Sequence, residues 1–86
     1  MNNKERIWML LKEKFNIKEE YLREEYLDKA LTGYPYYLPG HYLVYLLLEL
    51  TALFGEFSQE DIKNNGLYSI RNILNILEKM QKENSK

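Results

Sequence analysis

The side chains that could carry chemistry in this chain are few and far apart. His41 is the only histidine and cysteine is absent, so thiolate nucleophiles, disulfides and cysteine-ligated metal centres are excluded. No second histidine is available to complete a metal shell around His41. Neighbouring carboxylates such as Glu24 and Glu25 have no nucleophile or base beside them. We therefore expect neither a catalytic site nor a metal site.

Tyrosine is the unusual feature of the composition, with eight residues in a chain of 86. Tyrosine offers a large, rigid contact area at low entropy cost and is enriched at protein interfaces. The cluster supports two interpretations: it covers the core beneath a long loop with its hydroxyls in water, or it forms a surface for a partner. Its members are Tyr34, Tyr36, Tyr37, Tyr42 and Tyr45.

Composition and charge indicate a folded protein with one domain, which we expect to span residues 1–86. Hydrophobic residues make up 45% of the chain. The net charge is −1 and the first thirty residues mix both signs, a pattern that argues against nucleic-acid binding. The most apolar stretch, residues 43–54, is shorter than the roughly 20 residues that span a bilayer. We expect a cytoplasmic protein without a membrane partner.

Apolar spacing predicts an all-α fold, a bundle of three long helices and one short helix. The first long helix covers residues 3–15, with Asn2 or Asn3 as its N-cap. The second covers residues 41–54 and ends at Gly55, a residue type that suits a helix C-cap. No segment alternates apolar and polar residues between hairpin turns, as half-buried strands would.

A long loop is expected between these two helices, because apolar residues in it recur about every five positions. That spacing suits neither a helical face nor a strand, so we expect a loop with one helical turn. Gly33 and Pro35 interrupt it. The loop should end in a type II turn centred on Pro39 and Gly40.

The second half of the chain carries two helix-start patterns. Ser58 and Asp61 match the capping box of a short helix, which residues 64–66 then break. Ser69 is placed to cap the last long helix. Residues 82–86 are polar, and we expect them to form a frayed tail.

The core should form where the apolar stripes of the long helices face one another. The second helix is apolar on almost every side, since only His41, Glu49 and Thr51 are clearly polar in it. Such a helix must be central or must have a partner. The predicted core residues are Leu10, Leu43, Leu47, Leu50, Phe54, Ile70, Ile73 and Leu77.

Several runs along the chain resemble acyl carrier proteins. They are Leu31-Thr32-Gly33, Leu43 to Leu50, Glu60-Asp61-Ile62 and Tyr68-Ser69-Ile70, together with Phe54 and Ile73. More narrowly, Leu-Thr-Gly followed by Leu-Val-Tyr-Leu-Leu-Leu-Glu-Leu is similar to the acyl carrier-related proteins of bacterial peptide maturation systems of the bacteriocin type. The resemblance covers about residues 1–80 and implies an acyl-carrier-protein-like four-helix bundle.

Carrier proteins need a serine at the start of the second long helix, where phosphopantetheine is attached. Counting back from Phe54, this position falls on Gly40, flanked by Pro39 and His41. Glycine has no oxygen to modify, and residues 33–50 contain no serine or threonine. The resemblance therefore implies a carrier-like protein that holds no cofactor and is not an enzyme.

The resemblance also implies where a partner would bind. Carrier proteins present acidic residues on the second helix to basic patches of their enzymes, whereas the matching stretch here keeps only Glu49. Tyrosines take the other positions, so aromatic contacts are expected to replace charged ones. The expected partner-binding residues are Tyr36, Tyr37, Tyr42, Tyr45 and Glu49.

The leading hypothesis is an interaction or scaffold protein of a bacterial peptide maturation system. Its partner would be a protein or peptide, with peptide-modifying enzymes among the expected partners. A second hypothesis is a true acyl or peptidyl carrier loaded at an unrecognised residue, against which Gly40 argues. A third is a small helical regulatory or nucleic-acid-binding domain, but no helix is lined with the Arg, Lys, Asn or Gln of a recognition helix.

Overall fold

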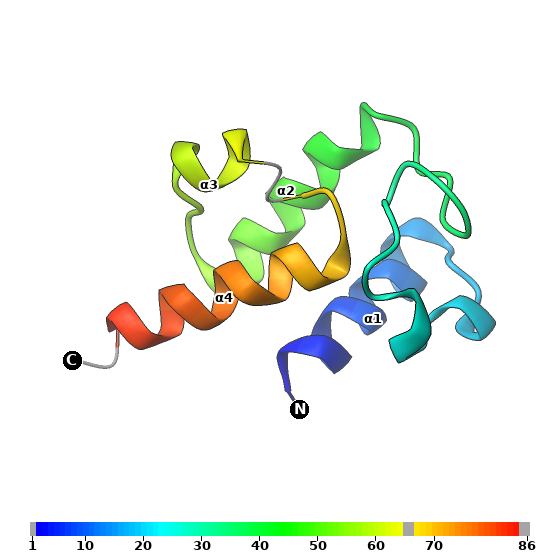
Figure 1. Ribbon diagram of the computed structural model, residues 1–86, viewed down its shortest axis with the longest axis horizontal. Coiled ribbons are helices and arrows are strands. Elements are labelled where there is room, and N and C mark those ends of the chain that lie inside the picture. Colours follow the sequence, from blue (N-terminus) through cyan, green and yellow to red (C-terminus); the bar gives the residue numbers. More distant parts are fainter. Residues whose placement is uncertain (1, 65–66, 85–86) are drawn as a thin grey trace.

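Four α-helices make up most of the computed structural model, which describes residues 2–64 and 67–84 (Figure 1). Two 3-10 turns, Glu19–Tyr21 and Glu24–Tyr26, lie in the long segment between the first two helices. No strand forms within the described residues, so the all-α prediction is confirmed. The helices are α1 (Asn3–Phe15), α2 (Tyr42–Phe54), α3 (Gln59–Lys63) and α4 (Ile70–Asn84).

Three of the four helices begin at the polar residues that the sequence predicts as caps. Asn2, Ser58 and Ser69 each accept a hydrogen bond from the backbone amide three residues later, at 2.8, 3.1 and 3.2 Å. Each bond satisfies one of the amides that a helix N-terminus leaves unpaired, which contributes about 1 kcal/mol. Local sequence therefore fixes where α1, α3 and α4 start.

The start of α2 differs from the prediction. The amide of Tyr42 donates to the carbonyl of Pro39 at 2.9 Å, and that of Leu43 donates to Gly40 at 3.1 Å. A type II turn needs a positive φ at Gly40, but Gly55 is the glycine with positive φ among the described residues. The type II prediction is wrong, because helix-like turns already begin at Pro39 and lead directly into α2.

The predicted ends of α2, α3 and α4 can be compared with the structure. Gly55 ends α2 with φ +103°, and its amide donates to the carbonyl of Thr51 at 2.9 Å, as expected of a C-cap glycine. α4 continues through Asn84, into the part expected to be a frayed tail. Of the predicted break at residues 64–66, only Asn64 lies within the described residues.

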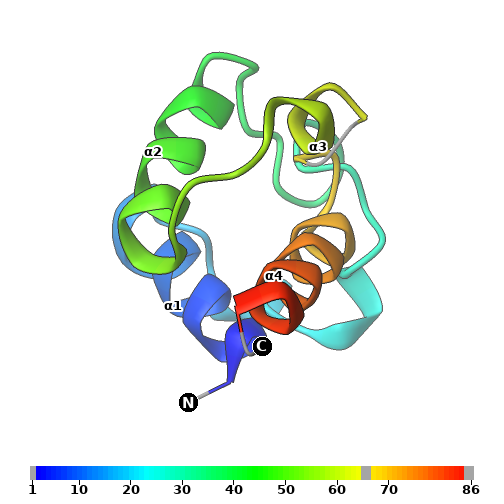
Figure 2. The ribbon, with the colours of Figure 1, turned by 90° about the vertical axis from the view of Figure 1, so that its left-hand side faces the viewer.

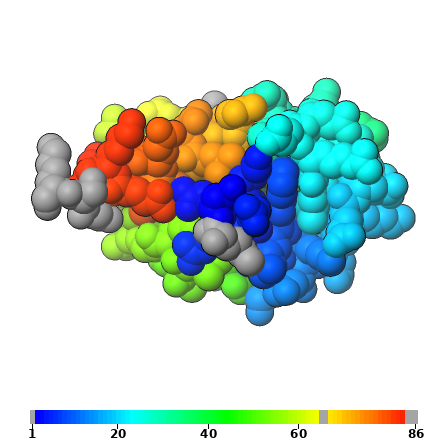
Figure 3. All heavy atoms as spheres, turned by 90° about the horizontal axis from the view of Figure 1, so that it is seen from below, coloured from blue at the N-terminus to red at the C-terminus, as the bar shows by residue number. Residues whose placement is uncertain are grey.

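α1 runs antiparallel to both α2 and α4. Its start meets the end of α2, where the Arg6 guanidinium lies 4.6 Å from the Phe54 ring centroid. Asn3 likewise exchanges two 3.1 Å side-chain hydrogen bonds with Gln81 near the end of α4. Figure 2 shows α1 at the foot of the bundle beside both helices. From below, α1 lies between the end of α4 and the cyan segment that follows α1 (Figure 3).

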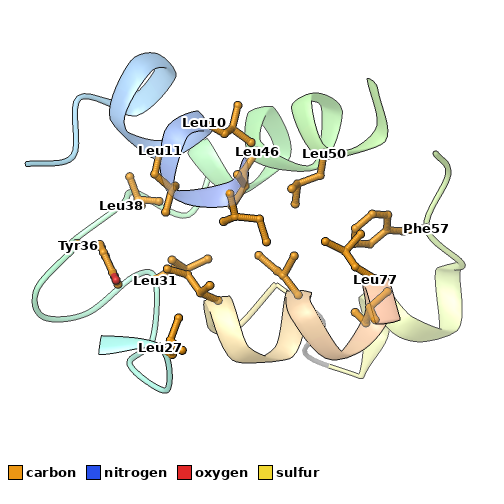
Figure 4. Packing of buried hydrophobic residues seen from close by; sticks show 14 residues of the cluster. Leu10, Leu11, Leu27, Leu31, Tyr36, Leu38, Leu46, Leu50, Phe57 and Leu77 are labelled. Carbon is orange, nitrogen blue, oxygen red and sulfur yellow. The ribbon is translucent and has the colours of Figure 1, made fainter. Parts of the chain in front are cut away.

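The core combines side chains from the long helices with side chains from the connecting segments (Figure 4). Leu46, not Leu47, takes the central position on α2, and Leu43, Leu47 and Phe54 are only partly buried at its edge. Helices contribute Ile7, Leu10, Leu11, Leu46, Leu50, Ile70, Ile73, Ile76 and Leu77, and connecting segments contribute Leu27, Leu31, Tyr36, Leu38 and Phe57.

Backbone hydrogen bonds hold the loop segment 27–38 in place against the start of α4. The amide of Leu31 donates to the carbonyl of Tyr68 at 2.8 Å, and the amide of Arg71 donates to Leu27 at 2.9 Å. The second bond satisfies another amide of the α4 N-terminus. The predicted loop therefore contains two 3-10 turns where one helical turn was expected, and its segment 27–38 contributes side chains to the core.

Candidate functional site

α2 has one buried side and one exposed side. Leu46 and Leu50 are fully buried, at 0% exposure, one helical turn apart. Leu48 points the opposite way and is 62% exposed. A soluble helix normally carries polar residues on its outer side, but here that side is almost entirely apolar.

The exposed apolar side chains form a continuous set that we call the α2 face. Five of them lie on α2, and Met9 of α1 joins them because it lines the same cavity as Leu53. All six are 39–62% exposed. The α2 face consists of Met9, Tyr42, Val44, Tyr45, Leu48 and Leu53.

A groove separates α1 from α2 along one edge of this face, and we call it the α1–α2 groove. It comprises two open cavities of about 210 and 340 Å³, both lined by Lys14 and Glu49. The smaller cavity is also lined by Arg6, Met9, Leu10, Glu13 and Leu53, and the larger by Phe15, Asn16, Tyr42 and Tyr45.

Aromatic contacts position the tyrosines at one end of the groove. The ring of Tyr42 lies 6.3 Å from Phe15 in a tilted pair and 6.1 Å from Tyr45 in an edge-to-face pair, measured between centroids. His41 adds an edge-to-face contact with Tyr42 at 4.7 Å. Tilted ring pairs at these separations are favourable. They hold Tyr42 and Tyr45 at the surface while leaving much of each ring exposed.

Charges on the groove differ from charges elsewhere in the molecule. Within residues 2–64 and 67–84, Glu13, Lys14 and Glu49 form no ion pair. The observed pairs lie on other surfaces and are Lys4 with Glu24, Lys12 with Glu19, Asp28 with Arg71, Asp61 with Lys79, and Glu78 with Lys82. The groove thus presents both signs of charge without internal partners.

The predicted partner-binding residues separate into two groups. Tyr42, Tyr45 and the half-buried Glu49 lie together on the groove, and Tyr37 is exposed in the preceding loop. Tyr36 is only 6% exposed, so the structure does not place its side chain on that surface. The core-covering interpretation of the tyrosine cluster therefore applies to Tyr36, and the partner-surface interpretation remains a prediction for the exposed members.

Tyr36 is part of the core, and its hydroxyl forms a hydrogen bond inside the fold. The hydroxyl donates to the backbone carbonyl of Tyr21 at 2.9 Å. Burial raises the pKa of Tyr36 to about 12. The neighbouring Tyr37 has a backbone φ of +49°, rare for a bulky residue, and its amide donates to Gly33 at 2.8 Å. That bond helps to fix Tyr37 with its ring outward.

Gly40, the position at which the family resemblance expects a serine, lies exposed just before α2 with Pro39 and His41. Apart from Gly40 and its two chain neighbours, no described residue has an atom within 4 Å of the place that a β-carbon would take. Gly40 also lacks the positive φ that would exclude other residues. The site therefore has room for a side chain, and only the residue type prevents it from carrying a hydroxyl.

Neither a metal centre nor a membrane span appears in the part of the chain that the structure describes. No group of three or more His, Asp or Glu side chains there is placed to hold a metal ion. No helix there is long and apolar enough to cross a bilayer. What the described surface does offer is the α2 face and its groove.

Sequence reasoning placed the candidate surface on α2 but missed four of the six residues of the α2 face. Val44, Leu48, Leu53 and Met9 were not among the expected contacts, because α2 has too few polar residues to show which side faces outward. The available signal was the all-round apolar character of α2, which indicated that this helix is either central or has a partner.

In comparisons with known proteins, the chain matches no protein-family model, no curated protein and no solved structure.

Proposed function

We propose that this protein is a non-enzymatic binding module that engages a partner protein through the α2 face and the α1–α2 groove. One observation carries the proposal: α2 buries one side only, while six large apolar side chains on and beside its other side are 39–62% exposed. Contiguous exposed apolar surface rimmed by polar groups marks interaction sites. Singly scattered apolar residues would carry no such meaning.

The groove favours a partner segment of defined chemistry. It is lined by apolar side chains such as Met9, Leu10 and Leu53 and by Glu13, Lys14 and Glu49, which form no ion pair within the described part of the chain. An amphipathic helix of the partner, with apolar anchors flanked by one acidic and one basic residue, would meet both needs. Tyr42 and Tyr45 would supply the aromatic anchors that dominate such interfaces.

At a finer level, we propose an acyl-carrier-like protein that acts in bacterial peptide maturation within the cytoplasm. The sequence runs that resemble the family support it, as does the order of two long helices, one short helix and one long helix. The partner would then be a peptide-modifying enzyme. Gly40 at the attachment position supports a protein that binds without carrying phosphopantetheine.

Partner capture tests the binding proposal. Wild-type protein and the Tyr45→Ala variant would serve as baits in a lysate of the producing cells. Proteins enriched by wild type would be purified, and their affinity for each variant measured by calorimetry. Tyr45→Ala should weaken binding by about 1 kcal/mol or more, because aromatic anchors dominate interface energetics.

The control for this experiment is Asn75→Ala, which changes an exposed residue on α4, away from the groove. It should bind like wild type. Equal affinity of wild type and Tyr45→Ala for every captured partner would contradict the proposal.

Mass spectrometry tests the carrier-like part. Wild-type protein incubated with coenzyme A and a broad-specificity phosphopantetheinyl transferase should gain no mass, because Gly40 offers no acceptor. The Gly40→Ser variant should gain one phosphopantetheine unit, since the site is exposed and has room for the side chain. Modification of the wild type would overturn the proposal, and an unmodified Gly40→Ser would count against the family resemblance.

A further inference from the structure

The outer side of α2 is shaped to meet a copy of itself. Val44, Leu48 and Ala52 are spaced by four residues and form one uncharged ridge, and all three are exposed. Leu48 is the middle residue of α2 (Tyr42–Phe54). Ridges of this spacing interdigitate in the commonest class of helix packing, with axes crossing at about −50°.

We infer that, in the absence of its partner, the α2 face is covered by the α2 face of a second copy in a two-fold symmetric dimer. This inference rests on the proposed function, since it concerns the same surface. A two-fold axis through Leu48 runs the two α2 helices antiparallel. Val44 of each copy then lies opposite Ala52 of the other, so a larger side chain meets a small one at both ends of the ridge.

The area available matches what a dimer of ordinary size requires. Six side chains that are 39–62% exposed offer on the order of 400 Å² of apolar surface. One side of a standard interface buries about 800 Å², of which a little over half is apolar. The α2 face as a whole offers nearly all of that apolar share, and Val44, Tyr45 and Leu48, on and beside the ridge, account for more than half of it.

Charge also permits self-pairing, because an interface with two-fold symmetry must be complementary to itself. The ridge has no charged residue, so no like charges meet at the axis. The groove beside it carries equal numbers of each sign, Arg6 and Lys14 with Glu13 and Glu49. The groove therefore has no net charge that would oppose pairing with a second copy.

Self-pairing would regulate access to the binding surface. Tyr45 borders the ridge, so a dimer covers it and a partner must displace the second copy to reach it. Partner affinity should then fall as the concentration of this protein rises. This protects an apolar surface that would otherwise attract non-specific contacts.

Sedimentation equilibrium between about 1 and 500 µM tests the dimer directly, with an expected dissociation constant in the micromolar range. Leu48→Glu should weaken dimerisation about 100-fold, because the two-fold axis brings the new carboxylates together. Leu48 is 62% exposed, so this variant should keep its folded circular-dichroism spectrum and melting temperature. Asn75→Glu on exposed α4 makes a matched change of charge and should dimerise like wild type.

A cross-linking measurement locates the contact without changing charge. The chain has no cysteine, so Leu48→Cys carries a single thiol, and a short bifunctional maleimide should join two copies through it. Asn75→Cys should remain uncrosslinked under the same conditions.

A wild-type protein that stays monomeric at 500 µM, or a Leu48→Glu variant that still dimerises, would overturn the inference. If the protein is monomeric but Tyr45→Ala still loses partner binding, the proposed function stands and only the dimer fails. If the protein dimerises through Leu48 while Tyr45→Ala leaves partner affinity unchanged, the dimer stands and the proposed function fails.

Discussion

α2 and the loop segment 27–38 reverse the usual relation between apolar sequence and burial. α2 is the most apolar element of the chain, yet only Leu46 and Leu50 of it are buried. The loop segment contains glycine, proline and charged residues, yet Leu31 in it is fully buried. The core is completed by the loop on the side of α4, and the outer side of α2 lies outside the core.

Hydrogen bonding explains how the loop segment 27–38 can be part of the core. A buried loop leaves backbone polar groups to be satisfied, and here those groups pair with the start of α4 and with each other. Leu31 donates to Tyr68, and Leu38 donates to Leu31 at 2.9 Å. The comparison teaches that exposed apolar residues on α2 are surplus to folding, which leaves them available for binding.

The largest expected effect on stability comes from truncating a loop side chain that is buried in the core. Leu31→Ala should lower the free energy of unfolding by about 2–5 kcal/mol, as for a core leucine in a helix, because Leu31 is fully buried. Urea unfolding would measure it. The neighbouring Thr32→Ala, at an exposed position, should change stability by less than about 0.5 kcal/mol. If Leu31→Ala leaves the free energy of unfolding unchanged, the loop does not complete the core.

A smaller effect is expected from the loop's buried hydroxyl. Tyr36→Phe removes the hydrogen bond to the carbonyl of Tyr21 and should cost about 1 kcal/mol. The exposed Tyr68 provides the control, since Tyr68→Phe should leave stability unchanged. Chemical denaturation of both variants at neutral pH would decide whether the hydroxyl contributes.

Alkaline pH offers a second readout of the same residue. The pKa of Tyr36 is raised from 10.0 to about 12 by burial, so the folded state holds the proton that the unfolded chain loses first. Stability is complete below pH 10 and should fall as pH rises from about 10 to about 12. Tyr36→Phe should flatten this part of the stability curve. An unchanged curve would show that another group governs alkaline unfolding.

The smallest effect is expected from an ion pair outside the groove. It joins Asp61 of α3 to Lys79 of α4. Hydrogen bonds from Lys79, at 2.7 Å, and from Ser58 hold the pKa of Asp61 below its ordinary value. Its contribution is present above about pH 4 and is lost as the pH falls through the lowered pKa. Lys79→Met should therefore reduce the loss of stability in acid, and Lys63→Met should not. If the two variants lose stability equally as the pH falls, the ion pair of Asp61 with Lys79 does not contribute to acid unfolding.

Much of the fold could be predicted from local patterns, whereas the orientation of α2 could not. Asn2, Ser58 and Ser69 have side chains that cap helices by themselves, so the sequence located three helix starts. Leu46 and Leu47 are the same residue type on a helix with apolar residues all round, and periodicity cannot distinguish its buried side.

The loop's burial was equally hidden, because it depends on contacts between distant parts of the chain. Leu31 pairs with Tyr68, and Leu27 pairs with Arg71, across more than thirty residues of sequence. No spacing rule relates such residues. For the candidate site, residue type identified Tyr42 and Tyr45, while Tyr36 needed the structure to show that it is buried.

The most direct test of the central claim compares two adjacent residues of α2, of which Leu46 is buried and Tyr45 is exposed. Urea unfolding followed by Trp8 fluorescence at about 0.1 µM would exclude any contribution from association. Leu46→Ala should lower the free energy of unfolding by about 2–5 kcal/mol, and Tyr45→Ala by no more than about 0.5 kcal/mol. If Tyr45→Ala proves as destabilising as Leu46→Ala, the outer side of α2 holds the fold together and is not free to bind a partner.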